Sequence, residues 1–161
     1  MKELRKLLVK FFIFSSLVME SATALQAQNL DKVVVQHMVN SKQFTFKAQT
    51  ALPMTGMLKQ LSTDYDVKFF GDSIVAYLPY FGRAYSVPYG GEGGINFTST
   101  QFEYKAKPRK KGGWDISIKP KDTSDVRELK FTISETGSAN LQVSSNNRQP
   151  ISFQGYVVER K

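Results

Sequence analysis

Hydrophobic and polar positions follow two different periods along the chain. Between residues 30 and 38, the apolar positions recur at the spacing of one helical face: Leu30, Val33, Val34 and Met38. Asn29 or Asp31 can cap this segment, so the pattern predicts one helix of about three turns that ends near residue 41.

From residue 44 onward, the period of a strand with one buried face replaces the helical period. The alternating runs are 44–49, 102–107, 114–119, 129–134, 139–144 and 151–157, and apolar runs at 67–70 and 73–78 predict a hairpin around Gly71-Asp72. The links between the later runs are short, which favours antiparallel neighbours because a parallel crossover needs about a dozen residues. We therefore expect an α+β, mainly β fold. One N-terminal helix packs on an antiparallel up-and-down meander, either a curved open sheet or a partly closed barrel, and covers an open end or an exposed face.

The first 27 residues have the order of a secretory signal peptide. Lys2, Arg5, Lys6 and Lys10 form a basic start, residues 11–19 are mostly apolar, and small residues follow as cleavage contexts. We predict a signal peptide at 1–27, cut after Ala27, and a single β-rich domain at 28–161. The apolar stretch is shorter than the roughly 20 residues that span a bilayer, so the cleaved chain is not expected to be an integral membrane protein. The alternative is an N-terminal anchor that is never cut.

The composition of the chain excludes several kinds of site. The chain has 161 residues and no cysteine, which excludes disulfides, thiolate metal sites, a cysteine nucleophile and a lipobox cysteine. About 130 residues after cleavage are enough for one core. The net charge is +8, and loss of the signal would leave 18 basic against 12 acidic residues, a net of +6. This balance favours association with anionic surfaces.

In residues 77–97, five aromatic side chains and an arginine precede four glycines at 90–94, and Pro79 and Pro88 favour a structured loop over a strand. One interpretation is a ligand platform, because rings stack on flat apolar faces and arginine binds carboxylate or phosphate. Its expected contacts are Tyr80, Phe81, Arg83, Tyr85 and Tyr89. The other interpretation is that the aromatic residues plug one end of the sheet as core. The run 90–94 is interpreted as a connector or lid, because residues 95–97 continue extended and open no helix.

A second candidate surface is basic. Lys107, Arg109, Lys110 and Lys111 cluster near one predicted hairpin tip, where they could contact anionic lipid or polysaccharide. The alternative is a solvated tip that protects a sheet edge. Nucleic acid is not an expected partner, because only Tyr104 and Trp114 flank the cluster.

No catalytic motif, metal site or cofactor site is predicted. His37 is the only histidine, and the carboxylates show no metal-ligand spacing. The first hypothesis is thus an exported, periplasmic or extracellular, non-catalytic binding or structural module whose partner is an envelope glycan, lipid or protein. The alternative is an envelope hydrolase acting on cell-wall or glycan material, with Glu92 and Asp115 meeting after folding. A third hypothesis is assembly through exposed strand edges.

The segment Tyr77-Leu-Pro-Tyr-Phe-Gly-Arg-Ala-Tyr85 resembles the family called domain of unknown function 4251. The likeness extends to Phe44-Thr-Phe46, 72–78, 137–139 and 148–155, and it spans nearly all of the chain after the signal. The resemblance implies a shared fold and a place in the bacterial envelope or outside the cell, but no activity, ligand or catalytic residue. Many relatives carry a lipobox cysteine, which this chain lacks.

Overall fold

The computed structural model describes residues 30–62, 64–85 and 93–160. The expected signal peptide, Tyr89 and Glu92 lie outside the described residues. The elements are helix α2 (Lys32–Ser41) and strands β1 (Gln43–Pro53), β2 (Lys59–Gln60), β3 (Asp66–Phe70), β4 (Ile74–Leu78), β5 (Ile95–Ser99), β6 (Phe102–Pro108), β7 (Trp114–Pro120), β8 (Val126–Ile133), β9 (Ser138–Ser145) and β10 (Ile151–Glu159).

The predicted helix is confirmed as α2, and Asp31 is its cap. The Asp31 carboxylate accepts a hydrogen bond from the Val33 N–H at 3.2 Å, which satisfies one of the free donors of the first turn. The helix ends where Lys42 adopts the left-handed conformation with φ 56° and donates its N–H to the Met38 carbonyl. Val35, Met38 and Val39 form the buried face.

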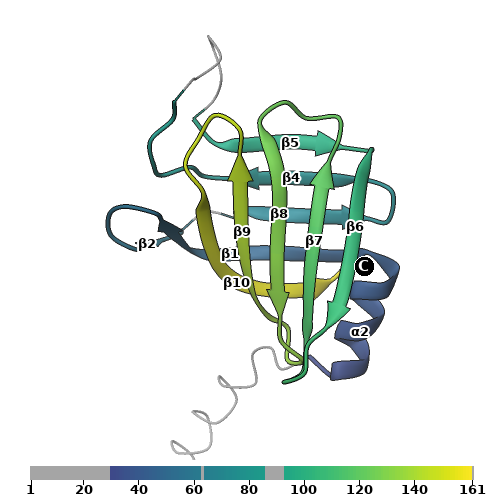
Figure 1. Ribbon diagram of the computed structural model, residues 1–161. Coiled ribbons are helices and arrows are strands. Elements are labelled where there is room, and N and C mark those ends of the chain that lie inside the picture. The colour runs from purple at the N-terminus through teal and green to yellow at the C-terminus, as the bar shows by residue number, and fades with distance from the viewer. Residues whose placement is uncertain (1–29, 63, 86–92, 161) are drawn as a thin grey trace, which may run out of the picture.

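All ten strands belong to one antiparallel sheet. Its order is β5-β4-β3-β1-β10-β9-β8-β7-β6, and β2 pairs with β1. Strands β6 to β10 are consecutive neighbours, so the predicted meander is confirmed for this half. Figure 1 shows β1, β3, β4 and β5 crossing behind β6 to β9, while β10 curves from one group to the other. The sheet therefore folds over on itself into a nearly closed barrel shape whose two edges are β5 and β6.

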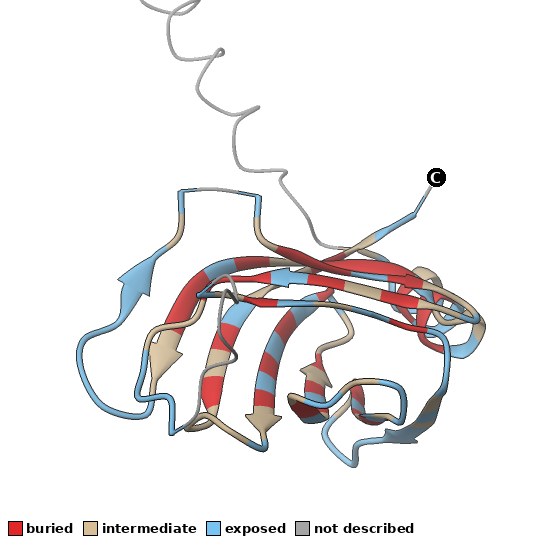
Figure 2. Cartoon of the chain, turned by 90° about the horizontal axis from the view of Figure 1, so that it is seen from above, coloured by how far each residue is buried: buried red, intermediate tan, exposed pale blue. Residues whose placement is uncertain are grey.

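The core lies between the two groups of strands. Cross-strand neighbours Ile116, Phe131 and Leu141 form one buried row across β7, β8 and β9. Phe131 also meets Phe46 from the opposite layer edge to face, with ring centres 5.4 Å apart. Seen from above in Figure 2, buried and exposed positions alternate along the strands, as the period of two predicts.

Helix α2 lies beside the lower end of the sheet, next to β1, β6 and β10 (Figure 1). The Tyr104 hydroxyl of edge strand β6 donates to the Val39 carbonyl of the helix at 2.9 Å. Burial raises the pKa of Tyr104 far above its usual range, so this hydroxyl stays protonated as a donor. The helix thus covers an open end of the sheet, one of the two expected positions.

The turn from β5 to β6 is held by a carboxylate. Asp122, in the turn after β7, accepts hydrogen bonds from the backbone N–H groups of Thr100 and Gln101 at 2.8 and 3.1 Å, and from the Ser99 hydroxyl. These donors lower the pKa of Asp122 to about 2, the Ser99 hydroxyl contributing most. The anchored turn joins two strands that do not pair with each other.

The structure corrects one prediction and extends the others. The loop interpretation of residues 77–97 is too wide at both ends: Tyr77 and Leu78 belong to β4, as the run 73–78 predicts, and residues 95–97 belong to β5, which pairs with β4 over its whole length. Strand β2 was not predicted, since its two residues are too few for a period of two to show. Strand β1 continues to Pro53 through an irregularity between Ala48 and Thr50.

Candidate functional site

The segment after β4 is attached to the chain before β10. The Tyr80 hydroxyl donates a hydrogen bond shared between the carbonyls of Arg83, at 2.8 Å, and Gln149, at 3.2 Å. The Tyr85 N–H donates to the Asn147 carbonyl, and the Gln149 N–H donates to the Arg83 carbonyl. Burial raises the pKa of Tyr80. Tyr80 is therefore a structural residue that fixes the loop in place.

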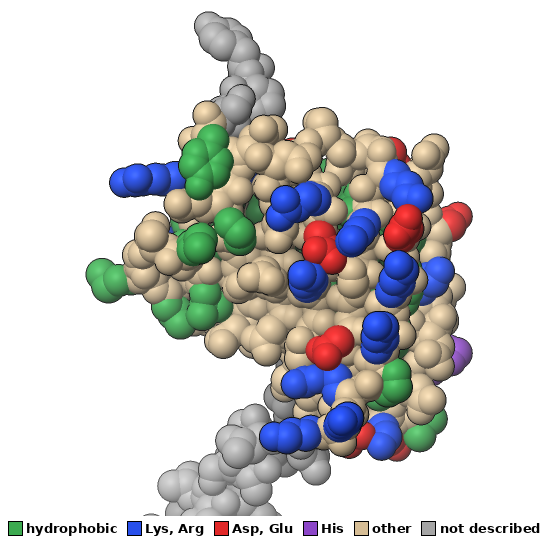
Figure 3. Space-filling view, in the orientation of Figure 1, with side chains coloured by type: hydrophobic (Ala, Val, Ile, Leu, Met, Phe, Trp, Pro, Cys, Tyr) green, Lys and Arg blue, Asp and Glu red, His purple; other side chains and the backbone are tan. Residues whose placement is uncertain are grey.

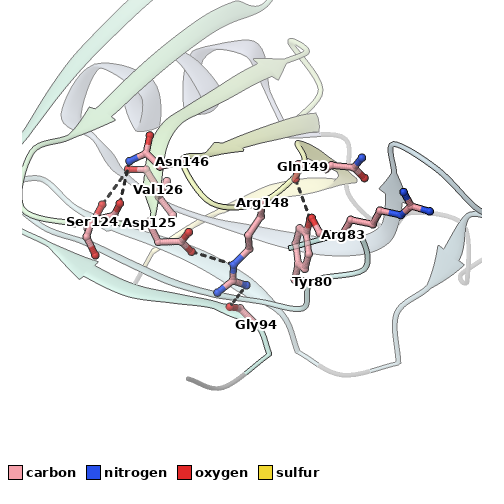
Figure 4. Close-up of polar contacts among 10 residues, drawn as sticks. Tyr80, Arg83, Gly94, Ser124, Asp125, Val126, Asn146, Arg148 and Gln149 are labelled. Carbon is pink, nitrogen blue, oxygen red and sulfur yellow. Dashed lines mark hydrogen bonds and ion pairs between the residues drawn. The ribbon is translucent and has the colours of Figure 1, made fainter. Parts of the chain in front are cut away.

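The arginine that partners this aromatic ring is Arg148. Its guanidinium lies 5.2 Å from the centre of the Tyr80 ring, Nη1 donates to the Gly94 carbonyl at 2.7 Å, and Nε lies 3.3 Å from Asp125 Oδ2. Figure 4 shows Arg148 between Tyr80 and Asp125, while Arg83 points away from this cluster. Only 10% of the Arg148 side chain is exposed. Arg148 thus ties its own segment to three other parts of the chain, at Tyr80, Gly94 and Asp125.

The residues predicted to form the ligand platform therefore differ in how far they are exposed. Tyr80 and Phe81 are half-buried against the core, which matches the end-plug interpretation for these two. Arg83 and Tyr85 are exposed and remain available to a partner, with Tyr85 at 72% exposure. Tyr89 lies outside the described residues.

Sequence reasoning missed an apolar surface next to this loop. The turn between β1 and β2 exposes Met54, Met57 and Leu58 by 69%, 85% and 59%, and we call these three residues the apolar tip. Lys59, which follows the tip, places its ammonium group 5.3 Å from the centre of the Phe81 ring. The uncharged run from Pro53 to Leu58 was the available signal, because turns are usually polar.

The tip extends away from the body of the molecule. In Figure 1 the turn before β2 lies on the same side as the segment leading out of β4. Figure 3 shows hydrophobic side chains gathered along this left side, with basic groups beside them. Scattered exposed hydrophobic residues are ordinary on a protein surface, so it is the grouping of three on one protruding turn that makes the tip a candidate interaction site.

A shallow hollow of about 250 Å³ lies on the other side of the Tyr80 segment. Tyr65 and Tyr77 stack in it with ring centres 5.4 Å apart, and Gly94 borders it. A Cβ at Gly94 would come within 2.8 Å of the Leu78 carbonyl oxygen, so the backbone there needs a glycine.

The predicted basic cluster is confirmed as a hairpin tip between β6 and β7, and all four of its residues are exposed. The Arg109 carbonyl accepts a hydrogen bond from the Gly112 N–H. The Arg109 side chain places its Nε 3.4 Å from Asp115 Oδ1. Lys107, Lys110 and Lys111 form no ion pair with any residue that the structure describes.

Of the two carboxylates considered for catalysis, Glu92 lies outside the described residues, and Asp115 makes contacts within the fold, as the buried Asp66 also does. Asp115 accepts a hydrogen bond from the Thr132 hydroxyl at 3.0 Å and pairs with Arg109. Asp66 is buried between Lys47 and Lys68. Within residues 30–62, 64–85 and 93–160, no three histidine or acidic side chains are grouped to hold a metal ion, and no helix is long and apolar enough to cross a membrane.

Comparison with known proteins places the fold in one family. The family model described as "Domain of unknown function (DUF4251)" matches residues 26–157. The structure is similar to the crystal structure of a DUF4251 family protein from Bacteroides eggerthii DSM 20697, determined at 1.95 Å resolution, with a TM-score of 0.61 and 15% sequence identity. The match covers 83% of this chain and 90% of that one. No curated protein matches the sequence.

Proposed function

The protein belongs to the DUF4251 family, and from this premise we propose that it is a non-catalytic binding module that attaches to a lipid surface through the apolar tip. The exposure of Met54, Met57 and Leu58 carries this proposal. Three large apolar side chains on one protruding turn lose contact with water only if something covers them. The flexible methionine side chains can adapt to a fluid surface.

The shape of the tip favours a bilayer over a small ligand. A small apolar ligand needs a concave site, whereas this turn is convex and can enter the boundary between headgroups and acyl chains. Insertion of the three side chains is worth about 4 to 6 kcal/mol, which corresponds to an affinity between about 1 mM and tens of micromolar. Attachment through the tip alone is therefore weak and reversible.

Charged and aromatic residues beside the tip suit the same surface. Lys59 and Arg83 are exposed near it and can reach anionic headgroups, each adding about 1 kcal/mol. Tyr85 is an exposed aromatic with a polar hydroxyl, the type of side chain enriched at membrane interfaces. We therefore expect a preference for anionic over zwitterionic lipid.

The proposal includes export. The basic, apolar and small-residue zones of residues 1–27 support a removable signal, and a periplasmic or extracellular location would follow. N-terminal sequencing of exported material should begin at Gln28, and a start at Met1 would contradict cleavage.

Vesicle flotation tests the lipid proposal directly. The protein is mixed with vesicles of phosphatidylcholine and phosphatidylglycerol at 3:1, or of phosphatidylcholine alone, and the floating fraction is measured. We expect the wild type to float with the anionic vesicles, and Met57→Ser/Leu58→Ser to lose at least two thirds of that fraction.

Val33→Ser is the matched control, because Val33 is 69% exposed on α2, away from the tip. It should float as the wild type does. Equal flotation of wild type and tip variant, or no flotation of the wild type, would contradict attachment through the tip.

A further inference from the structure

The outer face of β6, β7 and β8 carries an ordered array of lysines. Lys105 pairs in register with Ser117, and Ser117 with Lys130, so the two lysines lie two strands apart, about 10 Å. Lys107 follows Lys105 on the same face about 7 Å further along the strand. Together with the hairpin tip they form what we call the basic strip: Lys105, Lys107, Arg109, Lys110, Lys111 and Lys130.

The basic strip carries a net positive charge, because its carboxylates pair with only some of its basic residues. Glu103, Asp115 and Glu128 lie on the same strands and pair with Lys105, Arg109 and Lys130, respectively. That leaves Lys107, Lys110 and Lys111 without an ion pair among the described residues. Two unit positive charges about 7 Å apart, the spacing of alternate positions on one strand, repel each other by about 0.6 kcal/mol in water. A bound anion would relieve this repulsion, which rigid strands and a tight hairpin otherwise maintain.

The surface under the strip is hollowed at two places. A depression of about 390 Å³ is lined by Lys105, Lys107 and Lys130. A second, of about 520 Å³, lies between the hairpin tip and the start of α2 and is lined by Arg109, Lys110 and Lys111. Lys32 and Glu135 also border it and pair with each other at 2.6 Å, so the hairpin cations supply its excess positive charge. The two linings share no residue, but they adjoin along the chain at Lys107–Pro108 and at Trp114–Asp115, on either side of the hairpin tip. Figure 3 shows the basic side chains spread over this face.

We propose that the basic strip binds a linear anionic polysaccharide that runs from the hairpin hollow onto the face of β6 to β8. The strand positions of Lys105, Lys107 and Lys130 lie about 7 to 10 Å apart, a spacing that charges repeated along a polymer can match. Lysine is a compact point charge with little demand on anion geometry, so carboxylate and sulfate sugars both fit.

The surface of the basic strip suits nucleic acid and membranes less well than a polysaccharide. Trp114, the aromatic residue that borders the second hollow, is buried, so the strip offers nucleotide bases no stacking surface. A membrane also fits poorly, because a flat headgroup layer leaves both hollows unfilled. In addition, the apolar tip projects to the left in Figure 3 while the strip faces the viewer, so a bilayer that the tip enters does not cover the strip.

Binding is measured with polygalacturonate and dextran sulfate as probes and neutral dextran as the blank. Trp114 is the only tryptophan and borders the second hollow, so its fluorescence reports occupancy. We expect both acidic polymers to bind and Lys107→Gln/Lys110→Gln/Lys111→Gln to bind about 30-fold more weakly in 50 mM salt. The slope of log affinity against log salt should become shallower by about 2.

Lys42→Gln/Lys68→Gln/Arg160→Gln is the control, because it removes the same charge from residues outside the strip. It should retain the wild-type affinity to within about threefold. Equal weakening of both triple variants, or acidic polymers that bind no better than neutral dextran, would overturn the proposal.

Two further probes distinguish the partner classes. Single-stranded DNA is measured with the wild type, and anionic vesicles with Met57→Ser/Leu58→Ser, in which the tip no longer contributes. An affinity for either probe equal to that for the polysaccharides would assign the strip to another partner. Weaker binding of both supports the polysaccharide, and neither result depends on the lipid proposal for the tip.

Discussion

Arg148 lies over the ring of Tyr80, with the guanidinium carbon 5.2 Å from the ring centre, and the same guanidinium reaches Asp125 and the Gly94 carbonyl. Tyr80 and Arg148 are 68 positions apart in the sequence. Their contact joins the end of β4 to the chain that enters β10, so it fixes the loop beside which Arg83 and Tyr85 are exposed.

Removal of this arginine should destabilise the protein. Arg148→Ala leaves Asp125 without its cation and the Gly94 carbonyl without its donor. We expect this to lower the free energy of unfolding by about 2 kcal/mol. The melting temperature should fall by about 4 to 8 °C in a calorimetric scan. Arg83→Ala is the control and should stay within about 0.5 kcal/mol of the wild type, because the Arg83 side chain is exposed. Equal loss in both variants would reverse the roles assigned to the two arginines.

Phe131 connects the two layers of the core and should dominate stability. Its ring meets Phe44, Phe46 and Phe69 at centre distances of 6.3, 5.4 and 5.7 Å. We expect Phe131→Ala to cost about 3 to 5 kcal/mol, because it leaves a cavity between the layers. Urea unfolding measures this, with Tyr85→Ala as the exposed aromatic control. A change below about 1 kcal/mol for Phe131→Ala would show that the layers do not depend on this contact.

The turn between β5 and β6 should make stability depend on pH. The folded pKa of Asp122 is lowered to about 2 from the ordinary value of 3.8, so its charged form is favoured by folding. That stabilisation is complete above pH 4 and is lost as the pH falls through 2. Asp122→Asn should therefore lower the urea midpoint at pH 6, and the gap to the wild type should narrow between pH 4 and pH 2. A gap that is constant with pH would contradict a role for the charge.

Gly155 should not accept a side chain. It faces the irregular part of β1, and a Cβ there would overlap the Lys47 carbonyl oxygen and lie 3.2 Å from the Ala48 Cα. We expect Gly155→Ala to cost at least about 2 kcal/mol, because the backbone of one of the two strands must shift. Gly93→Ala, which has open space around its Cβ, is the control for the same measurement. Equal midpoints for the two variants would show that the strands can separate easily.

Local patterns in the sequence determined most of the elements. The helix, the Gly71-Asp72 hairpin and the meander from β6 to β9 depend on residues that are neighbours in the chain, and they were predicted correctly. For the helix cap the sequence left Asn29 and Asp31 open, and the structure selects Asp31. The basic hairpin tip was also predicted, because its two strands are adjacent in the sequence. Family membership followed from short segments such as Tyr77 to Tyr85.

Only the tertiary structure decided which side chains are available for binding. Sequence reasoning proposed Arg83 as a ligand contact but did not find that Arg148 packs on the Tyr80 ring, and it passed over Met54, Met57 and Leu58. Exposure and partner choice depend on which distant strands come together, here β4 with the chain before β10, and β1 with the short β2. Periodicity reports which face of a strand is apolar, whereas it does not report what that strand packs against.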